Sequence, residues 1–579
     1  MNERVTAIRA RKAKRWGVAM AIALAGSVVA TSNTQAATEA KSGAPKSGGT
    51  ITVAIDATVG GHCFQNALAG GGLGTSRSIF EQLFERTRSG KFVGYLAESA
   101  TPSADNLVWT IKLRPGIKYS NGEPFNAANV KLNLDVGRGD SPSATYLGTG
   151  VAVNANISIV EVIDDITLKV TLNKADANLP ALIYRAGRYV MRASAQINSP
   201  TTCPTNPIGT GPFMMQSYNP DQLVVVRNPN YWRKDGKGRQ LPYLDGITFI
   251  NVKEASQRAA AVRTGTVDVA FFTQGDATFT NDLFKRKSVV TGYKSTPTAW
   301  GQWVPNVGKA GSPFKFKNCR LAAAHAMDWN AYNKVRLKGT GDYSGSIVGK
   351  SNPMFTLEGA PKYDLAKARE FLTACNTDLG AAAPMKLTLY ADTSSQSLNN
   401  TKFIQASMEK AGIQFNNIFQ AESTPLIGKI YAAGGNAFDF AEGTPAEGAS
   451  PAYVVPFAMS NAFPAGSTNP IVPKFKAAGL LGRFGIILAL GNHGDTKVDD
   501  LVYAAQAETN PAAAKTKWKA VTAYLQSEGY VIPAVHGGFK EFVNNKSKLG
   551  GVGTLKMPSG DLADIVETKG FEYTGIWKK

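Results

Sequence analysis

Cysteine and histidine are scarce in this sequence. Its 579 residues include only four cysteines and four histidines. No two cysteines have the Cys-x-x-Cys spacing of a redox or zinc site, and no two histidines lie within four residues of each other. The sequence therefore has no local metal-binding motif, and we expect no bound metal and no cofactor.

The motifs of several hydrolase classes are also missing. The chain has neither Gly-x-Ser-x-Gly, nor Ser-x-x-Lys together with its partner motifs, nor His-Glu-x-x-His. Residues 341–345 approach the first motif but fail on spacing. We therefore expect a protein that is not an enzyme, although this search leaves open a pair of carboxylates that meet only in the folded chain.

No part of the chain after the first fifteen residues concentrates positive charge. Lys and Arg outnumber Asp and Glu by 63 to 43, a formal net charge of +20, but no basic run exceeds Lys285–Lys287. A nucleic-acid binder usually gathers such charge on one helix or stripe. We therefore expect no nucleic-acid partner, and a solvated basic surface that favours anionic lipid or wall polymer.

The first 36 residues have the three parts of a secretory signal. A basic stretch over 4–15 precedes an apolar run over 16–30, and small polar residues follow up to Ala36. The apolar run is about fifteen residues, short of the ~20 that span a bilayer, and no second such run occurs. We expect cleavage after Ala36 and then a flexible tether over 37–48; an uncleaved anchor is the alternative.

The leader also lacks two features of special export routes. It has no twin-arginine pair, and Ser27 stands where the lipid-bearing cysteine of a lipoprotein would follow Leu24-Ala25-Gly26. A serine cannot accept a thioether-linked lipid. We therefore expect an unlipidated protein, exported to the periplasm or the extracellular space.

The chain that follows mixes strand and helix patterns in irregular order. A length of 579 residues indicates two or three lobes, and the mixture favours an α/β fold rather than a barrel. We expect a Gly-rich irregular connection over 60–76 and a short helix over 78–86. Alternating polar and apolar residues predict strands over 50–55, 108–113 and 165–172, and we expect further strands over 223–226 and 247–250. Helical patterns lie at 255–264, 320–327, from Asp364 and from Asn510 to Gly529.

Several segments, taken in order, resemble a known family. Residues Trp109–Val130 contain a strand, an Arg-x-Gly turn, an aromatic residue, a Gly-x-Pro turn and a helix start, with Asn129 in place of the usual aspartate. This order is similar to a signature of the solute-binding proteins that serve peptide and nickel ABC importers, solute-binding family 5. Further matching segments follow in family order: 209–213, 227–232, 263–270, 320–328, 363–369, 411–413 and 507–511.

The resemblance implies a two-lobed periplasmic-binding-protein-like α/β fold of the large peptide-binding class, with an extra subdomain on the first lobe. It implies a monomeric substrate-binding component of an ABC importer. Such a protein captures a peptide or peptide-like solute in the cleft between its lobes by hinge closure and delivers it to a membrane permease. The expected parts are a first lobe from 49–75, 205–297 and 530–579, its subdomain from 76–204, and a second lobe from 298–529, so that the chain crosses the hinge near 298–303 and near 530–536.

The resemblance also places the ligand loop. In peptide-binding members a loop of the second lobe begins with Phe-Asp and carries a Trp and two Asp, the first of which pairs with the peptide amino group. Here the loop begins at Phe438-Asp439, and Thr444, Glu447 and Ser450 stand at those three positions. Glu447 keeps a carboxylate and is our first ligand-binding candidate, with a solvated loop acid as the alternative; Glu442 is the second. The altered loop favours a peptide-like metabolite, a sugar derivative or a metal chelate over an ordinary peptide.

Other candidate ligand contacts lie near the expected hinge crossings. Trp300 and Trp303 flank the first crossing; on a regular strand they face opposite sides, so only one of them can line the cleft, and packing in the core is the alternative for both. Tyr453 follows the acid loop. His62 after the first strand and His536 at the second crossing are the remaining candidates, because these two could converge on a metal complex.

The four cysteines of an exported chain suggest two disulfides, and three connectivities are open. We favour Cys63–Cys203 with Cys319–Cys375, because each bridge then stays inside one lobe and leaves the hinge free. Two other functions remain open on the same scaffold. These are an exported enzyme and a chaperone that holds unfolded chains.

Overall fold

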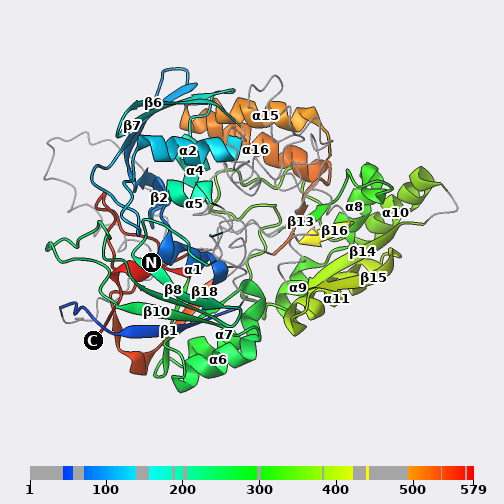
Figure 1. The fold of residues 1–579 in the computed structure, drawn as a ribbon. Coiled ribbons are helices and arrows are strands. Elements are labelled where there is room, and N and C mark those ends of the chain that lie inside the picture. The colour runs from blue at the N-terminus through cyan, green and yellow to red at the C-terminus, as the bar shows by residue number, and fades with distance from the viewer. Residues whose placement is uncertain are drawn as a thin grey trace, which may run out of the picture. The chain divides into compact units, whose positions relative to one another are not determined.

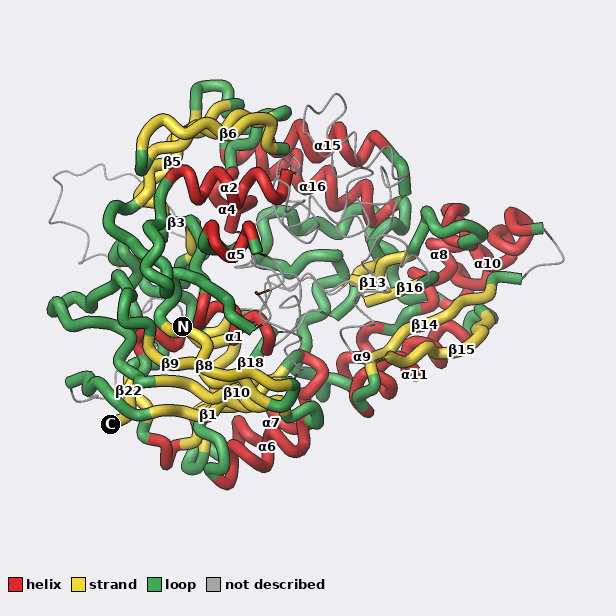
Figure 2. The backbone as a smooth tube through the Cα atoms, viewed as in Figure 1, coloured by secondary structure: helices red, strands yellow, loops and turns green. Residues whose placement is uncertain are grey.

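The computed structural model describes most of the chain after residue 43. The described residues are 44–56, 71–138, 156–184, 189–199, 202, 205–295, 302–380, 384–421, 438–442, 493–535, 538–567 and 570–579. They form three main sheets with helices between and around them, as Figures 1 and 2 show. Among these residues, no helix has the length and apolar character needed to cross a bilayer.

The first sheet has seven strands in the order β12-β18-β11-β1-β10-β9-β8. Its central strand β1 pairs in parallel with β10 and β11, and both of its faces are buried, because Ile51 and Val53 pack in one core and Ala54 in another. Helices α6 (Ala255–Thr264) and α7 (Ala277–Lys285) pack against the Ala54 face (Figure 1). The strands are β1 (Thr50–Ile55), β8 (Phe213–Asn219), β9 (Gln222–Arg227), β10 (Gly246–Asn251), β11 (Val269–Phe272), β12 (Val290–Lys294) and β18 (Lys540–Asn544).

A four-stranded antiparallel sheet in the order β4-β5-β7-β6 has one face in a core of its own. In β5 the buried Trp109, Ile111 and Leu113 alternate with exposed Thr110 and Lys112, the period that a half-buried strand requires. The elements of this part are β2 (Phe84–Arg86), β3 (Phe92–Gly94), β4 (Ala97–Pro102), β5 (Val108–Leu113), α2 (Ala127–Arg138), β6 (Ile157–Asp164), β7 (Thr167–Leu172), α4 (Leu179–Tyr184) and α5 (Ser194–Asn198).

The third sheet has five strands in the order β15-β14-β16-β13-β17. Its core is separate from those of the other sheets, and a further cluster lies between α15 and α16. The elements are β13 (Gln302–Pro305), α8 (Lys317–Ala326), α9 (Trp329–Val335), α10 (Leu365–Leu379), β14 (Lys386–Asp392), α11 (Ser395–Glu409), β15 (Gln414–Ala421), β16 (Phe440–Glu442), α15 (Thr496–Gln506), α16 (Pro511–Ser527) and β17 (Ile532–Pro533).

Short elements complete the described chain. The 3-10 turns are η3 (Gln274–Asp276), η4 (Pro313–Lys315), η7 (Asn545–Ser547) and η8 (Tyr573–Gly575). The short strands are β19 (Leu549–Gly550), β20 (Val566–Glu567), β21 (Gly570–Phe571) and β22 (Trp577–Lys578).

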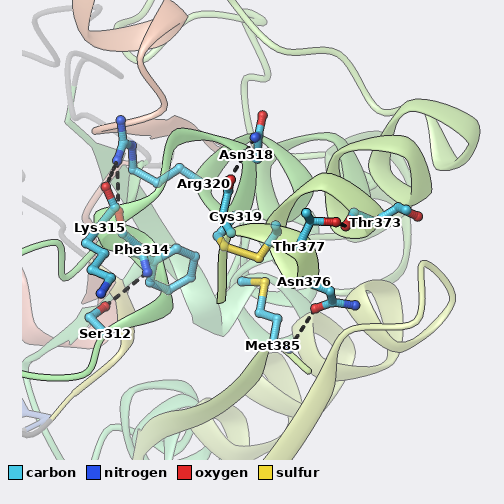
Figure 3. The surroundings of a disulfide bond; sticks show 12 residues. Ser312, Phe314, Lys315, Asn318, Cys319, Arg320, Thr373, Asn376, Thr377 and Met385 are labelled. Atoms are coloured by element: carbon cyan, nitrogen blue, oxygen red, sulfur yellow. Dashed lines mark hydrogen bonds between the residues drawn. A yellow bond between two sulfur atoms is a disulfide. The ribbon is translucent and has the colours of Figure 1, made fainter. Parts of the chain in front are cut away.

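A disulfide joins Cys319 on α8 to Cys375 on α10, 56 residues apart, and it is the pairing that we favoured for these two cysteines. Figure 3 shows the bridge in the core of the third sheet, where both cysteines are fully buried. The next residue, Asn376, accepts a hydrogen bond from the Met385 amide at 2.9 Å, which ties the end of α10 to the start of β14. Cys63 and Cys203 lie outside the described residues, so their bridge remains a prediction.

One local expectation is wrong. A helix, α1 (Gly71–Ile79), covers part of the expected Gly-rich connection, and the expected helix over 78–86 ends at Ile79 and is followed by strand β2. Packing overrides helix propensity here. Thr75 and Ser78 are buried, and the Ser78 hydroxyl donates to the Thr75 carbonyl at 2.6 Å.

Candidate functional site

Two chain connections join the first sheet to the third. One leaves β12 and enters β13, and the other leaves β17 and enters β18. On the first-sheet side, the Ser295 amide donates to the Phe539 carbonyl at 2.9 Å and the Phe539 amide donates to the Ser295 hydroxyl at 2.9 Å. On the other side, Trp303 lies opposite Ile532 in the β13–β17 pair. The described residues at the two ends of these connections therefore lie next to each other.

The second crossing differs from the expected lobe boundary. We grouped residues 530–579 with the first lobe, but β17 (Ile532–Pro533) is an edge strand of the third sheet. The reason is its pairing with β13, a partner more than two hundred residues earlier in the chain that local sequence does not reveal. The chain returns to the first sheet at Lys540, the first residue of β18.

Trp303 is the candidate ligand contact whose side chain the structure places. It is 5 % exposed, and its ring centroid lies 4.9 Å from that of Phe440 in the core of the third sheet. Phe314 also packs against Phe440, with 5.7 Å between the two ring centroids. This arrangement corresponds to the packing alternative that the sequence left open for Trp303.

The start of the expected ligand loop is firmly held. The buried Asp439 carboxylate accepts a hydrogen bond from the Thr388 amide at 2.8 Å and forms an ion pair with Lys309. The Asn306 amide donates to the Asp439 carbonyl, and its side chain donates to the Phe438 carbonyl. The sequence placed Phe438-Asp439 at the start of the loop but did not reveal this anchoring role for Asp439.

Strand β16 follows Asp439 directly in the chain and belongs to the first part of the expected ligand loop. In the β13–β16 pair, Glu442 lies opposite Trp303, so the backbone of one acidic candidate reaches the first crossing. The other candidates, Glu447, Trp300, Tyr453, His62 and His536, lie outside the described residues. Within the described part, no cluster of three or more His, Cys, Asp and Glu side chains has the geometry of a metal site.

Lys540, which the sequence analysis did not single out, adds a positive charge at the second crossing. It lies opposite Phe272 on β11 and Lys294 on β12, and it is 8 % exposed. Burial lowers the pKa of its ammonium group to about 8, although the nearby Asp276 charge opposes this shift. Strand β18 reads Lys-Glu-Phe-Val-Asn, so no apolar pattern in the sequence indicates that this lysine is buried.

Further contacts connect the helices and turns around the two sheets. Beside the crossings, the Gln396 side chain of α11 donates to the Gly275 carbonyl of η3, and the Ser395 hydroxyl donates to Glu254 at 3.3 Å. A separate contact joins Asp176, after β7, to Gln506 at the end of α15. The residues on the two sides of each contact are more than one hundred positions apart in the chain.

Comparison with known proteins identifies the family. The profile of bacterial extracellular solute-binding proteins, family 5, middle region, matches residues 91–454. The glutathione-binding protein GsiB of Escherichia coli strain K12 is 30 % identical over 302 residues, which are 51 % of this chain and 56 % of GsiB. The match thus spans about half the length of this relative.

Solved structures agree on the fold. The periplasmic binding protein DppA of Helicobacter pylori, in complex with the peptide STSA, has a TM-score of 0.72 at 19 % identity, covering 92 % of this chain and 98 % of DppA. NikZ of Campylobacter jejuni, in complex with Ni(L-His), has a TM-score of 0.68 at 16 % identity, covering 90 % of this chain and 97 % of NikZ. The fold is therefore the two-lobed α/β fold of the peptide-binding class.

The family profile covers more than half of the chain. The family is described as extracellular and solute-binding. The chain belongs to the bacterial extracellular solute-binding proteins of family 5.

Proposed function

We propose that this protein is the extracytoplasmic substrate-binding component of an ABC importer. It captures a peptide or peptide-like solute between its lobes by hinge closure and delivers it to a membrane permease, without covalent chemistry. The observation that carries the proposal is the pair of adjacent connections between the first and third sheets. Two short connections whose ends lie next to each other can bend together, so one lobe can rotate on the other while each sheet stays intact.

The ligand class follows from the relatives and from the acid loop. GsiB is named for binding glutathione, and DppA was solved with a short peptide. Both ligands carry a free amino group, which a carboxylate can hold in a charge-assisted hydrogen bond. We propose Glu447 as that carboxylate, with Glu442, Trp300, Tyr453, His62 and His536 as further contacts. A γ-linked or modified peptide suits the altered loop better than an ordinary peptide.

The first experiment is mass spectrometry of compounds released by denaturing the natively exported protein. We expect short peptides or one peptide-like compound. A metal chelate or sugar derivative would correct the ligand class, and an empty protein that also fails to bind glutathione and di- to tetrapeptides in calorimetry would contradict the proposal. Conversion of an added compound with time would indicate an enzyme, and reduced aggregation of unfolded protein would indicate a chaperone.

The role of Glu447 has its own test. Glu447→Ala should weaken the binding of glutathione by about tenfold or more, because the ammonium group loses a charged partner. N-acetylglutathione, which has no ammonium group, is the matched control and should bind wild type and variant alike. Equal losses for both ligands, or no loss for either, would contradict the assignment.

We propose further that the exported protein is cleaved after Ala36, carries no lipid and is a monomer. Intact-mass measurement checks the first two points, and light scattering checks the third. A diacylglyceryl adduct at the mature N-terminus would contradict the unlipidated state.

A further inference from the structure

A contact far from the two crossings joins the four-stranded sheet to helix α15. Gln506, the last residue of α15, accepts a hydrogen bond from the Ala177 amide at 3.1 Å through its carbonyl oxygen. Its side-chain amide donates to the Asp176 carboxylate, with 3.2 Å between Nε2 and Oδ2. Asp176 is 1 % exposed and Gln506 is 5 % exposed, so the contact is dry.

Among the residues that the structure describes, no cation forms an ion pair with the Asp176 carboxylate. Its second oxygen accepts the Asn178 amide at 2.7 Å, so both of its partners are neutral amides. The backbone of Asp176 is held by hydrogen bonds that do not involve its carboxylate. The Asp176 amide donates to the Asn106 carbonyl, and the Trp109 indole donates to the Asp176 carbonyl. A buried carboxylate with only neutral partners is costly to ionise.

Burial raises the pKa of Asp176 from 3.8 to about 6, and the hydrogen bond from Asn178 opposes that rise. No charged side chain in the described part of the chain contributes to the shift. The ionisable residues of the segments packed at the contact are Asp105 in the turn before β5, Lys174 after β7, and Lys497, Asp499, Asp500, Tyr503 and Glu508 in and after α15. The Lys497 ammonium group lies over the Tyr524 ring, 4.4 Å from its centroid. Asp105 is held by the Ser103 hydroxyl and Glu508 by Lys517, and Lys174 forms no ion pair with Asp176.

The two sides of the contact belong to different hydrophobic cores. Asp176 follows the four-stranded sheet, whose core includes Leu172 and Leu179 on either side of it. In α15, Val502 and Ala505 pack with Trp518 of α16 in another core. If the lobes separate, the contact breaks between these cores and Asp176 meets water, where its pKa returns towards 3.8.

We propose that the Asp176–Gln506 contact is a proton-dependent latch that holds the subdomain of the first lobe to the second lobe. The latched form binds a proton at Asp176, and the open form releases it above about pH 4. Because the latched form has the higher affinity for the proton, latching is favoured as the pH falls through about 6 towards 4 and is disfavoured above this range. This inference rests on the proposed hinge motion and adds its regulation by pH.

Hydrogen exchange of the Ala177 amide tests the latch directly, because this N–H crosses the contact. In the ligand-free wild-type protein, its protection, corrected for intrinsic exchange, should rise about tenfold between about pH 7.5 and about pH 5. Asp176→Asn should remove this rise in the protection of Ala177 and keep the contact at both pH values. The asparagine oxygen can still accept from Asn178, and the Gln506 amide can turn to accept from the new side-chain amide.

A second variant tests the same contact from the other side. Gln506→Glu places a carboxylate against Asp176, so the protection of Ala177 should fall below wild type near pH 7.5 and recover near pH 5. Asp164→Asn, in the exposed turn between β6 and β7, is the matched control and should behave as wild type. Circular dichroism at both pH values verifies that every variant is folded.

The proposal is contradicted if the Ala177 amide is equally protected at both pH values in the wild type. It is also contradicted if Asp176→Asn keeps the wild-type rise in this protection. These measurements use no ligand. They are therefore separate from the proposed transport function, which fails only if no solute binds.

Discussion

Glu81 is a buried acid whose carboxylate accepts hydrogen bonds from two neighbouring side chains. Its two carboxylate oxygens accept from the Tyr231 hydroxyl and from the Trp232 indole, each at 2.9 Å. Burial raises the pKa of Glu81 from 4.5 to about 7, although the hydrogen bonds and the Arg233 charge oppose the shift. The residue lies where the segment after α1 meets the Tyr231-Trp232 segment, a site that local sequence does not mark as buried.

This raised pKa predicts how stability depends on pH. The folded state holds a proton on Glu81 that the unfolded state has already lost above about pH 4.5, so the free energy of unfolding should fall as the pH rises from 4.5 to 7. The full cost at pH 8 is roughly 3 kcal/mol, at about 1.4 kcal/mol per pKa unit. Glu81→Gln should lose less stability than wild type between pH 5 and pH 8 in urea unfolding. Glu98→Gln, at an exposed ion pair with Lys112, is the control; equal pH dependence in all three proteins would refute the role of Glu81.

At the scale of elements, the sequence predicted best where caps and periodicity agree. The Asn510 side chain accepts from the Ala512 and Ala513 amides, and α16 continues to Ser527 with Trp518 and Val521 buried, as the cap and the apolar spacing indicated. Helix α1 was missed because its Gly and Ser residues have poor helix propensity, and its stability comes from contacts with distant segments.

The disulfide between α8 and α10 leads to a prediction about these elements. Removing it by the double change Cys319→Ala and Cys375→Ala should lower the free energy of unfolding by about 2–4 kcal/mol, because the unfolded chain gains the freedom of an opened loop. Urea unfolding under oxidising conditions measures the loss. Dithiothreitol should destabilise wild type more than the variant by a similar amount, because the predicted Cys63–Cys203 bridge would be reduced in both proteins. A variant as stable as oxidised wild type would show that the bridge does not contribute.

At the scale of the whole molecule, sequence patterns predicted single elements, whereas the resemblance indicated how distant segments combine. The first sheet indeed takes strands from both ends of the described chain, since β1 is at residue 50 and β18 ends at Asn544. Pairings such as β13 with β17, the burial of Lys540 and the Asp176–Gln506 contact depend on segments that meet only after folding. A single sequence carries no signal for them.

The charge of the whole molecule gives a last prediction. The formal net charge is +20, and the expected leader accounts for six basic residues and one acidic residue of it, so the exported chain remains strongly basic. Its cations are dispersed, and dispersed charges act through the long-range field, which salt screens over about 30 Å at 0.01 M and about 3 Å at 1 M.

We therefore expect the exported protein to sediment with vesicles of anionic lipid at about 0.01 M salt and to remain in solution at about 1 M. Vesicles of neutral lipid are the control and should bind little at either salt concentration. Binding that persists at high salt, or that is equal on neutral vesicles, would mean that an apolar segment, not the net charge, mediates the association. Salt-sensitive binding would instead place a basic carrier close to an anionic membrane surface, where a loaded solute-binding protein has the shortest path to a permease.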